Sequence, residues 1–295
     1  MAKGFPVPSA TGATDSLEDS NRRRGLMEGK RGLIMGVANG HSIAWGIAQA
    51  LADEGAELAF TFQGDAFRRR VEPLADSVDA ALVTPCDVSD EASLDSAFGA
   101  LADTWDRLDF VVHAIAYSRK EELKGRYADT SLENFLSTMH VSCYSFVSVA
   151  RRAAAMMGEG GSLLTLSYLG AQRVMPNYNV MGVAKAALEA SVRYLASDFG
   201  PDGIRVNGIS AGPMRTLAGS AIGSAREVFR YNRDHSPLRR SVDLPELGGS
   251  ALYLLSDLSS AVTGEIHYVD AGYNTVGMPH PDRLRATEGP ENTGD

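Results

Sequence analysis

Cysteine and long apolar runs are scarce in this chain, and each shortage excludes a class of protein. Two cysteines occur, Cys86 and Cys143, far apart and outside any metal-ligand spacing, which argues against a disulfide framework and predicts no metal site. Uninterrupted apolar runs stay below the roughly 18 residues that a membrane-spanning helix needs. Residues 1–30 also lack the apolar core of a secretory signal. We therefore expect a soluble, cytoplasmic protein.

Positive charge is also in short supply. The chain has 28 Lys and Arg against 37 Asp and Glu, a formal net charge of −9. Affinity for nucleic acid depends on neutralising phosphates with Lys and Arg, and attraction to an anionic membrane surface depends on the same residues. We expect neither nucleic acid nor a membrane among the partners.

Aliphatic residues and glycine are plentiful, with 44% hydrophobic residues and 30 glycines, which suits an α/β protein. Short apolar runs alternate with longer helical patterns, and parallel strands need such crossover connections. The sequence therefore predicts a Rossmann-like, doubly wound parallel sheet of about seven strands with helices on both faces. The expected strands are Gly32–Gly36, Glu57–Phe62, Ala80–Thr84, Phe110–Ile115, Ser162–Ser167, Arg205–Ser210 and Ile266–Val269.

The helices between these strands are expected to begin near Ile43, Asp65, Glu91, Ser131, Tyr178 and Pro245. Thr130 and Glu133 have the spacing of a capping box, which predicts a long helix continuing to about Met157. Composition divides the chain into a flexible leader over residues 1–28, one domain over 29–277 and a flexible tail over 278–295.

The stretch from Leu163 to Lys185 concentrates the chemistry. Seven helical steps separate Tyr178 from Lys185, so both side chains should share one helix face, with about 10 Å of rise between their Cα atoms. A lysine reaching back toward the phenol would favour a hydrogen-bonded, partly anionic tyrosine, which is proton-donor chemistry. The alternative is an amphipathic tyrosine and a snorkelling lysine on a surface helix.

The first strand-to-helix turn is a candidate phosphate site. Gly36 begins the turn, Gly40 lies within it, and Ser42 and Ile43 open the next helix, whose positive N-terminus suits a pyrophosphate. We expect the Ser42 hydroxyl to serve both as a donor and as the helix cap. The strict G-x-G-x-x-G pattern is absent, so a plain glycine turn is the alternative.

Residues after the second and third strands should meet the adenosine end of a dinucleotide. Gln63 stands where such folds often place a ribose-binding carboxylate, while Asp87 would accept from the adenine amino group and Val88 would cover the ring. Asp87 could instead be an ordinary helix N-terminal aspartate. The arginines at 68–70 spread around a helix, as a solvated face does more often than a 2′-phosphate clamp. These features favour NADH over NADPH.

Taken in order, these motifs resemble the short-chain dehydrogenase/reductase superfamily, and more closely its divergent branch of NADH-dependent enoyl-acyl carrier protein reductases from bacterial type II fatty acid synthesis. The resemblance covers about residues 26–275. It rests on G-x5-S-x-A from Gly36, Y-x6-K ending at Lys185, the additional Tyr168, and Ser-Ala-Gly-Pro-Met-Arg-Thr over Ser210–Thr216. A wider Tyr-to-Lys spacing than in carbonyl reductases suits a reaction whose charge appears on a carbonyl oxygen away from the hydride's target.

The resemblance implies roles for individual residues. Tyr178 would stabilise the enolate, Lys185 would hold the nicotinamide ribose, and Tyr168 would orient the acyl chain or serve the proton path. Further implied contacts to the nicotinamide are Ile115, Met214, Thr216 and Ala218, and those to the substrate are Ala116, Tyr117 and Ser118. The resemblance also implies an acyl carrier protein partner and a homotetramer.

Residues from about 214 to 234 are expected to form a substrate lid, because small residues there alternate with scattered apolar ones. Arg226, Arg230 and Arg233 would give this lid a basic rim for the acidic carrier protein; an ordinary surface helix is the alternative. Two other functions remain open for the whole chain: a ketoreductase of the same superfamily, and a catalytically silent dinucleotide sensor.

Overall fold

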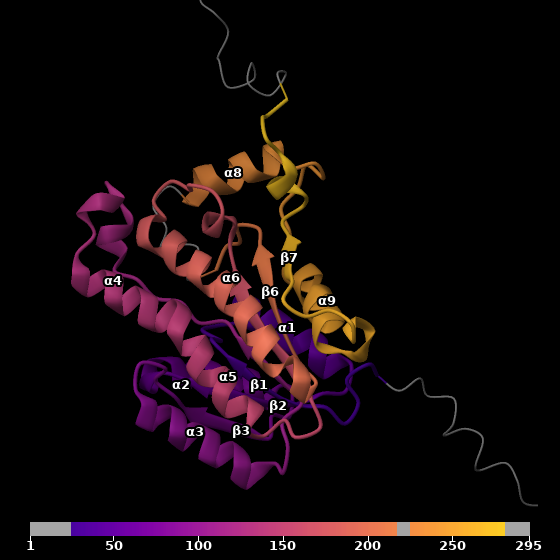
Figure 1. Cartoon of the computed structure of the whole chain (residues 1–295). Coiled ribbons are helices and arrows are strands. Elements are labelled where there is room, and N and C mark those ends of the chain that lie inside the picture. Colours follow the sequence, from indigo (N-terminus) through magenta and orange to yellow (C-terminus); the bar gives the residue numbers. More distant parts are fainter. Residues whose placement is uncertain (1–24, 217–224, 281–295) are drawn as a thin grey trace, which may run out of the picture.

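A seven-stranded parallel sheet forms the centre of the molecule (Figure 1). The computed structural model describes residues 25–216 and 225–280. Its strands are β1 Arg31–Met35, β2 Glu57–Phe62, β3 Leu82–Pro85, β4 Phe110–His113, β5 Gly161–Ser167, β6 Ile204–Ala211 and β7 Ile266–Val269. Every expected strand overlaps an observed one, so the predicted doubly wound α/β fold is confirmed.

Helices cover both faces of the sheet. The α-helices of the described residues are α1 Ile43–Asp53, α2 Gly64–Asp76, α3 Glu91–Thr104, α4 Leu132–Met139, α5 Ser145–Ala154, α6 Asn179–Phe199, α8 Ala225–His235 and α9 Leu244–Leu255. Successive strand residues point to opposite faces, so Leu163 packs with α3, α5 and α6 while Leu164 packs with α1, α2 and α9. No helix in the described ranges is both long and apolar enough to cross a bilayer.

The segment before β5 departs from the sequence prediction. Ser131 rather than Thr130 is the N-cap of α4, since the Ser131 hydroxyl accepts from the backbone N–H of Asn134. The predicted Thr130–Glu133 capping box is therefore wrong. The helix is also not uniform, because a π-helical segment, His140–Tyr144, separates α4 from α5. Ser145 donates to the Val141 carbonyl within this segment and competes for an acceptor of the regular helical ladder.

The strand order is β3-β2-β1-β4-β5-β6-β7, so successive strands are added on one side of β1 up to β3 and on its other side from β4 onward. In open parallel sheets, ligands bind outside the carboxyl ends of the strands at such a change of side. Helix α8 lies beyond the carboxyl ends of β6 and β7 (Figure 1). The fold therefore places the expected functional residues, which follow strands in the sequence, around one edge of the sheet.

Candidate active site

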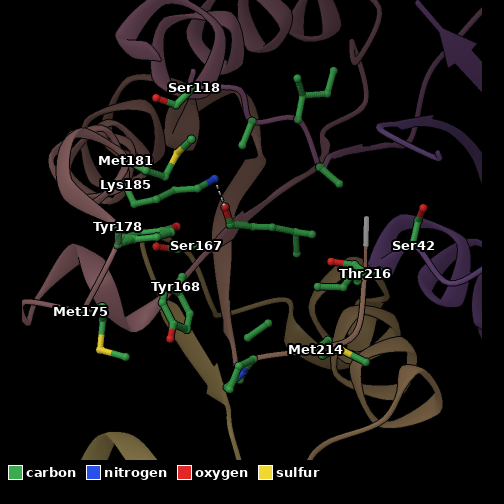
Figure 2. A pocket seen from close by; sticks show the side chains of 18 of the residues that line it. Ser42, Ser118, Ser167, Tyr168, Met175, Tyr178, Met181, Lys185, Met214 and Thr216 are labelled. Atoms are coloured by element: carbon green, nitrogen blue, oxygen red, sulfur yellow. Dashed lines mark hydrogen bonds between the residues drawn. The ribbon is translucent and has the colours of Figure 1, made fainter. Parts of the chain in front are cut away.

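A cavity of about 440 Å³ opens at the carboxyl ends of the central strands (Figure 2). Its size lies within the usual range for small-molecule sites. Segments after β1, β4, β5 and β6 line it, together with α6 and α8. Tyr178 and Lys185 lie at one side, while Ser42 and Thr216 lie at the other (Figure 2). The structure thus brings the expected catalytic pair and the expected phosphate turn to the same space.

The backbone around Tyr178 fixes its position. Tyr178 is the N-cap of α6, so the regular helix begins one residue later than predicted. Asn177 and Asn179 on either side have φ values of +57° and +35°, a region that asparagine tolerates better than most residues. The Asn179 amide donates to the carbonyls of Glu122 and Gly125, both at 3.3 Å. A turn of restricted geometry, tied to a distant loop, therefore presents the phenol to the cavity.

Two neighbours hold the ring of Tyr178 itself. Tyr168 meets it edge to face, with ring centroids 5.0 Å apart at 70°. Gly170 lies against the ring, since a Cβ atom there would stand 2.4 Å from a Tyr178 ring carbon. Any side chain at position 170 would therefore displace Tyr178. The two tyrosines that the sequence singled out form one packed unit on the cavity wall.

Tyr178 is a neutral phenol. Burial, which leaves 8% of the residue exposed, raises the pKa of its hydroxyl, and the neighbouring Tyr168 and Glu189 raise it further. Burial likewise raises the pKa of Tyr168. The expectation of a partly anionic Tyr178 is therefore wrong, because loss of solvent outweighs any help from the nearby ammonium. The group is suited to donate a hydrogen bond to a developing negative charge.

Lys185 is buried, with 6% of the residue exposed. Its ammonium donates to the Leu166 carbonyl at 2.7 Å, the dashed line in Figure 2. The lysine is thus anchored to the end of β5 rather than reaching back to the phenol as expected. Burial lowers the pKa of Lys185 to about 8, although Cys143 and Glu189 act in the opposite direction. Among the described residues that line the cavity, Lys185 is the one charged side chain.

The turn after β1 fits an anionic group, though not in every expected detail. Gly36 has φ of +99°, and a Cβ there would meet the Ala114 carbonyl oxygen at 2.1 Å, so the glycine is required by the adjoining β4 end. The Ser42 hydroxyl does not cap α1; it accepts from the N–H groups of Ala38 and Asn39 at 3.0 and 3.1 Å. The first turn of α1 contains no acidic residue, and Ile43 lines the cavity. Uncapped N–H groups at a helix start are a suitable cradle for a pyrophosphate.

Gln63 and Asp87 adjoin one another beyond this cavity, at the ends of β2 and β3. The Gln63 amide donates to the Asp87 carboxylate at 2.9 Å, and Ser89 donates to its other oxygen. Burial opposes ionisation, but these hydrogen bonds outweigh it and hold the pKa of Asp87 below its ordinary value. Asp90, not Asp87, caps α3, which removes the helix-cap alternative. Val88 is buried within the core layer of α3 and α5.

The remaining residues expected to contact the cofactor or the substrate either line the cavity or lie outside the described residues. Those that line the cavity are Ile115, Ala116, Tyr117, Ser118, Met214 and Thr216. Ala218 lies outside the described residues, as do residues 1–24 of the expected leader, 217–224 of the expected lid and 281–295 of the expected tail.

Sequence reasoning missed several apolar lining residues, among them Leu123, Met175, Met181 and Phe229. Met181 follows Tyr178 by three residues, so helical spacing could have identified it. Leu123 ends a short 3₁₀-helix, Lys120–Leu123, and Met175 lies in a loop, so neither belongs to a periodic pattern long enough to mark a side chain that faces a cavity. Phe229 comes from α8, within the described part of the expected lid.

The comparisons with known proteins agree on one family. A family model described as Enoyl-(Acyl carrier protein) reductase matches residues 36–274. The chain is 62% identical, over 90% of its length and 98% of the relative's, to enoyl-[acyl-carrier-protein] reductase [NADH] 2 of Rhizobium meliloti. Among solved structures, FabI from Candidatus Liberibacter asiaticus superposes with a TM-score of 0.86 at 55% identity, covering 88% of this chain and 100% of the other. The reductase of Anaplasma phagocytophilum in complex with NAD superposes with a TM-score of 0.85 at 58% identity, covering 88% and 99%.

Proposed function

Because the chain belongs to the enoyl-(acyl carrier protein) reductase family, we propose that it uses NADH to reduce the carbon–carbon double bond of trans-2-enoyl-acyl carrier protein thioesters. This reaction is the last step of the fatty acid elongation cycle. The observation that carries the proposal is the pairing, in one apolar cavity, of a buried neutral phenol on Tyr178 with the ammonium of Lys185.

NADH, when bound, supplies a hydride to the β-carbon of the enoyl group. The double-bond electrons then move toward the thioester carbonyl, and Tyr178 donates a hydrogen bond to the enolate oxygen as it becomes negative. One proton, taken up overall from solvent, adds at the α-carbon and completes the saturated thioester. The ammonium of Lys185 would add positive potential beside this oxygen and would hold the nicotinamide ribose. Tyr168 packs against the ring of Tyr178 and would orient the acyl chain or serve the proton path. The apolar lining excludes water and strengthens both interactions.

The residues present fit NADH along its whole length. Ser42 and Ile43 would meet the pyrophosphate at the start of α1. Gln63 and Asp87 would meet the adenosine, and the Asp87 carboxylate has room for a further donor beside those from Gln63 and Ser89. Gln63, at the ribose position, donates to the ionised Asp87, whose negative charge would repel a 2′-phosphate bound nearby, which supports NADH over NADPH. Near the nicotinamide, Ile115, Met214 and Thr216 would line its site.

Oxidation of NADH in the presence of crotonyl and acetoacetyl thioesters tests the proposed function. We expect cofactor absorbance to fall with the crotonyl thioester and not with the acetoacetyl thioester. The reverse preference would identify a ketoreductase. Tight NADH binding without turnover of any enoyl thioester would identify a dinucleotide sensor, and either result would reject the proposal.

Acyl carrier protein is proposed to dock at α8. Arg226, Arg230 and Arg233 recur at helical spacing and are exposed, whereas Val228 and Phe229 line the cavity. The helix therefore carries exposed arginines on its outer side, of which Arg233 is paired with Asp234, and apolar side chains on its inner side, as suits a lid between an acidic carrier and an acyl chain.

Charge reversal on this rim tests the docking surface. The double substitution Arg226→Glu with Arg230→Glu should raise KM for a carrier-bound enoyl substrate by about tenfold or more, because complementary charges guide association. KM for a short enoyl-CoA, measured in the same assay, should change far less. An equal loss on both substrates would mean that the substitutions damage the site itself.

A homotetramer in the cytoplasm completes the proposal. Large apolar side chains are exposed along α4 and α6: Leu132 at 72%, Leu136 at 58% and Tyr194 at 76%. Figure 1 shows α6 running beside the α4–α5 pair, so these side chains belong to neighbouring helices. Association of copies would cover such residues. Sedimentation velocity measures the oligomeric state directly.

The two cysteines are buried free thiols, which supports a reducing compartment.

A further inference from the structure

One side of α4 and of the π-helical segment after it carries three fully buried polar side chains. Asn134, Thr138 and Ser142 are each 0% exposed and recur every fourth residue. Side chains four residues apart on a helix lie above one another on the same side. We call these three residues the polar ladder. Buried polar groups are unfavourable unless each has a hydrogen-bond partner, so the position of those partners indicates what the ladder does.

All three ladder residues bond the segment that follows β4. Ser142 makes two bonds to Tyr117: its hydroxyl accepts from the Tyr117 N–H at 2.9 Å and donates to the Tyr117 carbonyl at 3.0 Å. Thr138 donates to the Ser118 hydroxyl at 2.9 Å. The Asn134 side-chain oxygen accepts from the Arg119 N–H at 3.0 Å. Three consecutive residues of the segment are thus fixed by three residues of one helix side.

The segment so held has no regular secondary structure to satisfy its backbone groups. Residues 114–119 form neither strand nor helix, and side chains of the ladder take the place of backbone partners. Ala116, Tyr117 and Ser118 line the cavity, and Figure 2 shows Ser118 on the side where Met181 and Lys185 lie. A polar network with every member paired is rigid, whereas the loss of one member leaves a buried group unpaired.

The π-helical segment contributes to this arrangement. Ser142 lies within His140–Tyr144, where the turns are wider than in an α-helix. Ser145, at the end of that segment, donates to the Val141 carbonyl and lies 2.9 Å from the buried His113 ring at the end of β4. The irregular turn is therefore attached to the same strand from which the lining segment departs.

We propose that Asn134, Thr138 and Ser142 are positioning residues that hold residues 116–118 as a preformed wall for the enoyl thioester. The inference deepens the proposed function and rests on it for the identity of the substrate. None of the three ladder residues lines the cavity. They act through the backbone of Tyr117 and Arg119 and through the Ser118 hydroxyl.

Substitutions that remove one hydroxyl test the ladder. Thr138→Val keeps the shape of the side chain and removes its donor, and Ser142→Ala leaves both polar groups of Tyr117 without their partner. For each variant we expect KM for crotonyl thioester to rise about tenfold, the size typical of an unpaired buried partner. We expect kcat to stay within about twofold and KM for NADH to be unchanged. Thr138→Ser retains the hydroxyl and should restore the wild-type KM.

Hydrogen exchange supplies a readout that does not depend on activity. Amides over residues 116–119 should exchange at least about tenfold faster in Thr138→Val and Ser142→Ala than in the wild type, while those of β5 should stay protected. Unchanged exchange with unchanged KM would overturn the inference. So would a joint rise in KM for NADH and enoyl substrate accompanied by faster exchange throughout the sheet, since that pattern reports general destabilisation. A wild type that reduces no enoyl thioester would reject the proposed function, while exchange would still decide whether the ladder holds the segment.

Discussion

Replacement of Tyr178 by phenylalanine is expected to lower kcat for enoyl reduction by about 10²-fold, the loss typical when one donor to a developing oxyanion is removed. The ring would keep its packing against Tyr168 and Gly170, because phenylalanine differs only by the hydroxyl. NADH binding should stay within about twofold, since the proposed partner of the phenol is the thioester and not the ribose. Stopped-flow fluorescence of NADH, with and without crotonyl thioester, separates binding from reduction.

Tyr168→Phe is the matched control for this prediction. It removes the same group from the adjoining ring in the same cavity. We expect a loss of less than about tenfold, because a residue that orients the substrate leaves the oxyanion donor in place. Equal losses from both variants would show that Tyr178 is not the distinctive donor, and the assignment of the two tyrosines would need to be exchanged or shared.

NADH binding is expected to weaken as pH rises through about 8. Burial sets the pKa of Lys185 near this value, with Cys143 and Glu189 raising it and the buried His113 facing it from β4. Above that pH the ammonium loses its charge and one of its donors, so the proposed contact with the nicotinamide ribose should weaken. We expect Kd for NADH to rise about tenfold between pH 7 and pH 9.5. Fluorescence titration across this range measures the effect.

Lys185→Met is the control for the pH dependence. This variant should bind NADH about 10²-fold more weakly at pH 7 and should show a flat profile over the same range, because the titrating group is gone. A variant that keeps the wild-type pH dependence would place the responsible group elsewhere.

The free energy of unfolding should rise over the pH range in which NADH binding weakens. Below about pH 8 Lys185 is charged in both the folded and the unfolded chain, and the cost of burying the charge is fully present. Between about 8 and the ordinary value of 10.5 the unfolded chain binds more protons, so the free energy of unfolding gains a contribution of roughly 3 kcal/mol as pH rises. The conditions that favour cofactor binding are those in which the lysine destabilises the fold.

The sheet could be predicted because its signal is local. Runs such as Glu57–Phe62 and Ile266–Val269 are apolar, β-branched or aromatic, and bounded by breakers, and both were observed as strands with unchanged ends. Helix caps were harder to predict. Thr130 and Ser131 are adjacent hydroxyl residues, and only the backbone geometry decides which of the two caps α4.

The candidate site was predicted as a set of residues and less well as a set of contacts. The order of motifs along the chain indicated Tyr178, Lys185 and the turn at Gly36. The bond from Lys185 to the Leu166 carbonyl could not be foreseen, because a backbone acceptor has no residue type to mark it. The polar ladder was missed for a related reason: asparagine, threonine and serine on a helix look like an ordinary solvated face until a loop from elsewhere in the chain covers them.

The residues that line the cavity are spread along most of the chain, so the cavity can be completed only late in synthesis and folding. The wall begins with the turn at residues 38–44 and is completed by residues 211–216 and by α8. A nascent chain that has emerged from the ribosome only as far as β5 would contain the lining segments after β1 and β4. It would lack the later segments that complete the cavity for the acyl group. Recovery of enzymatic activity during refolding should therefore follow the packing of these late segments against the cavity.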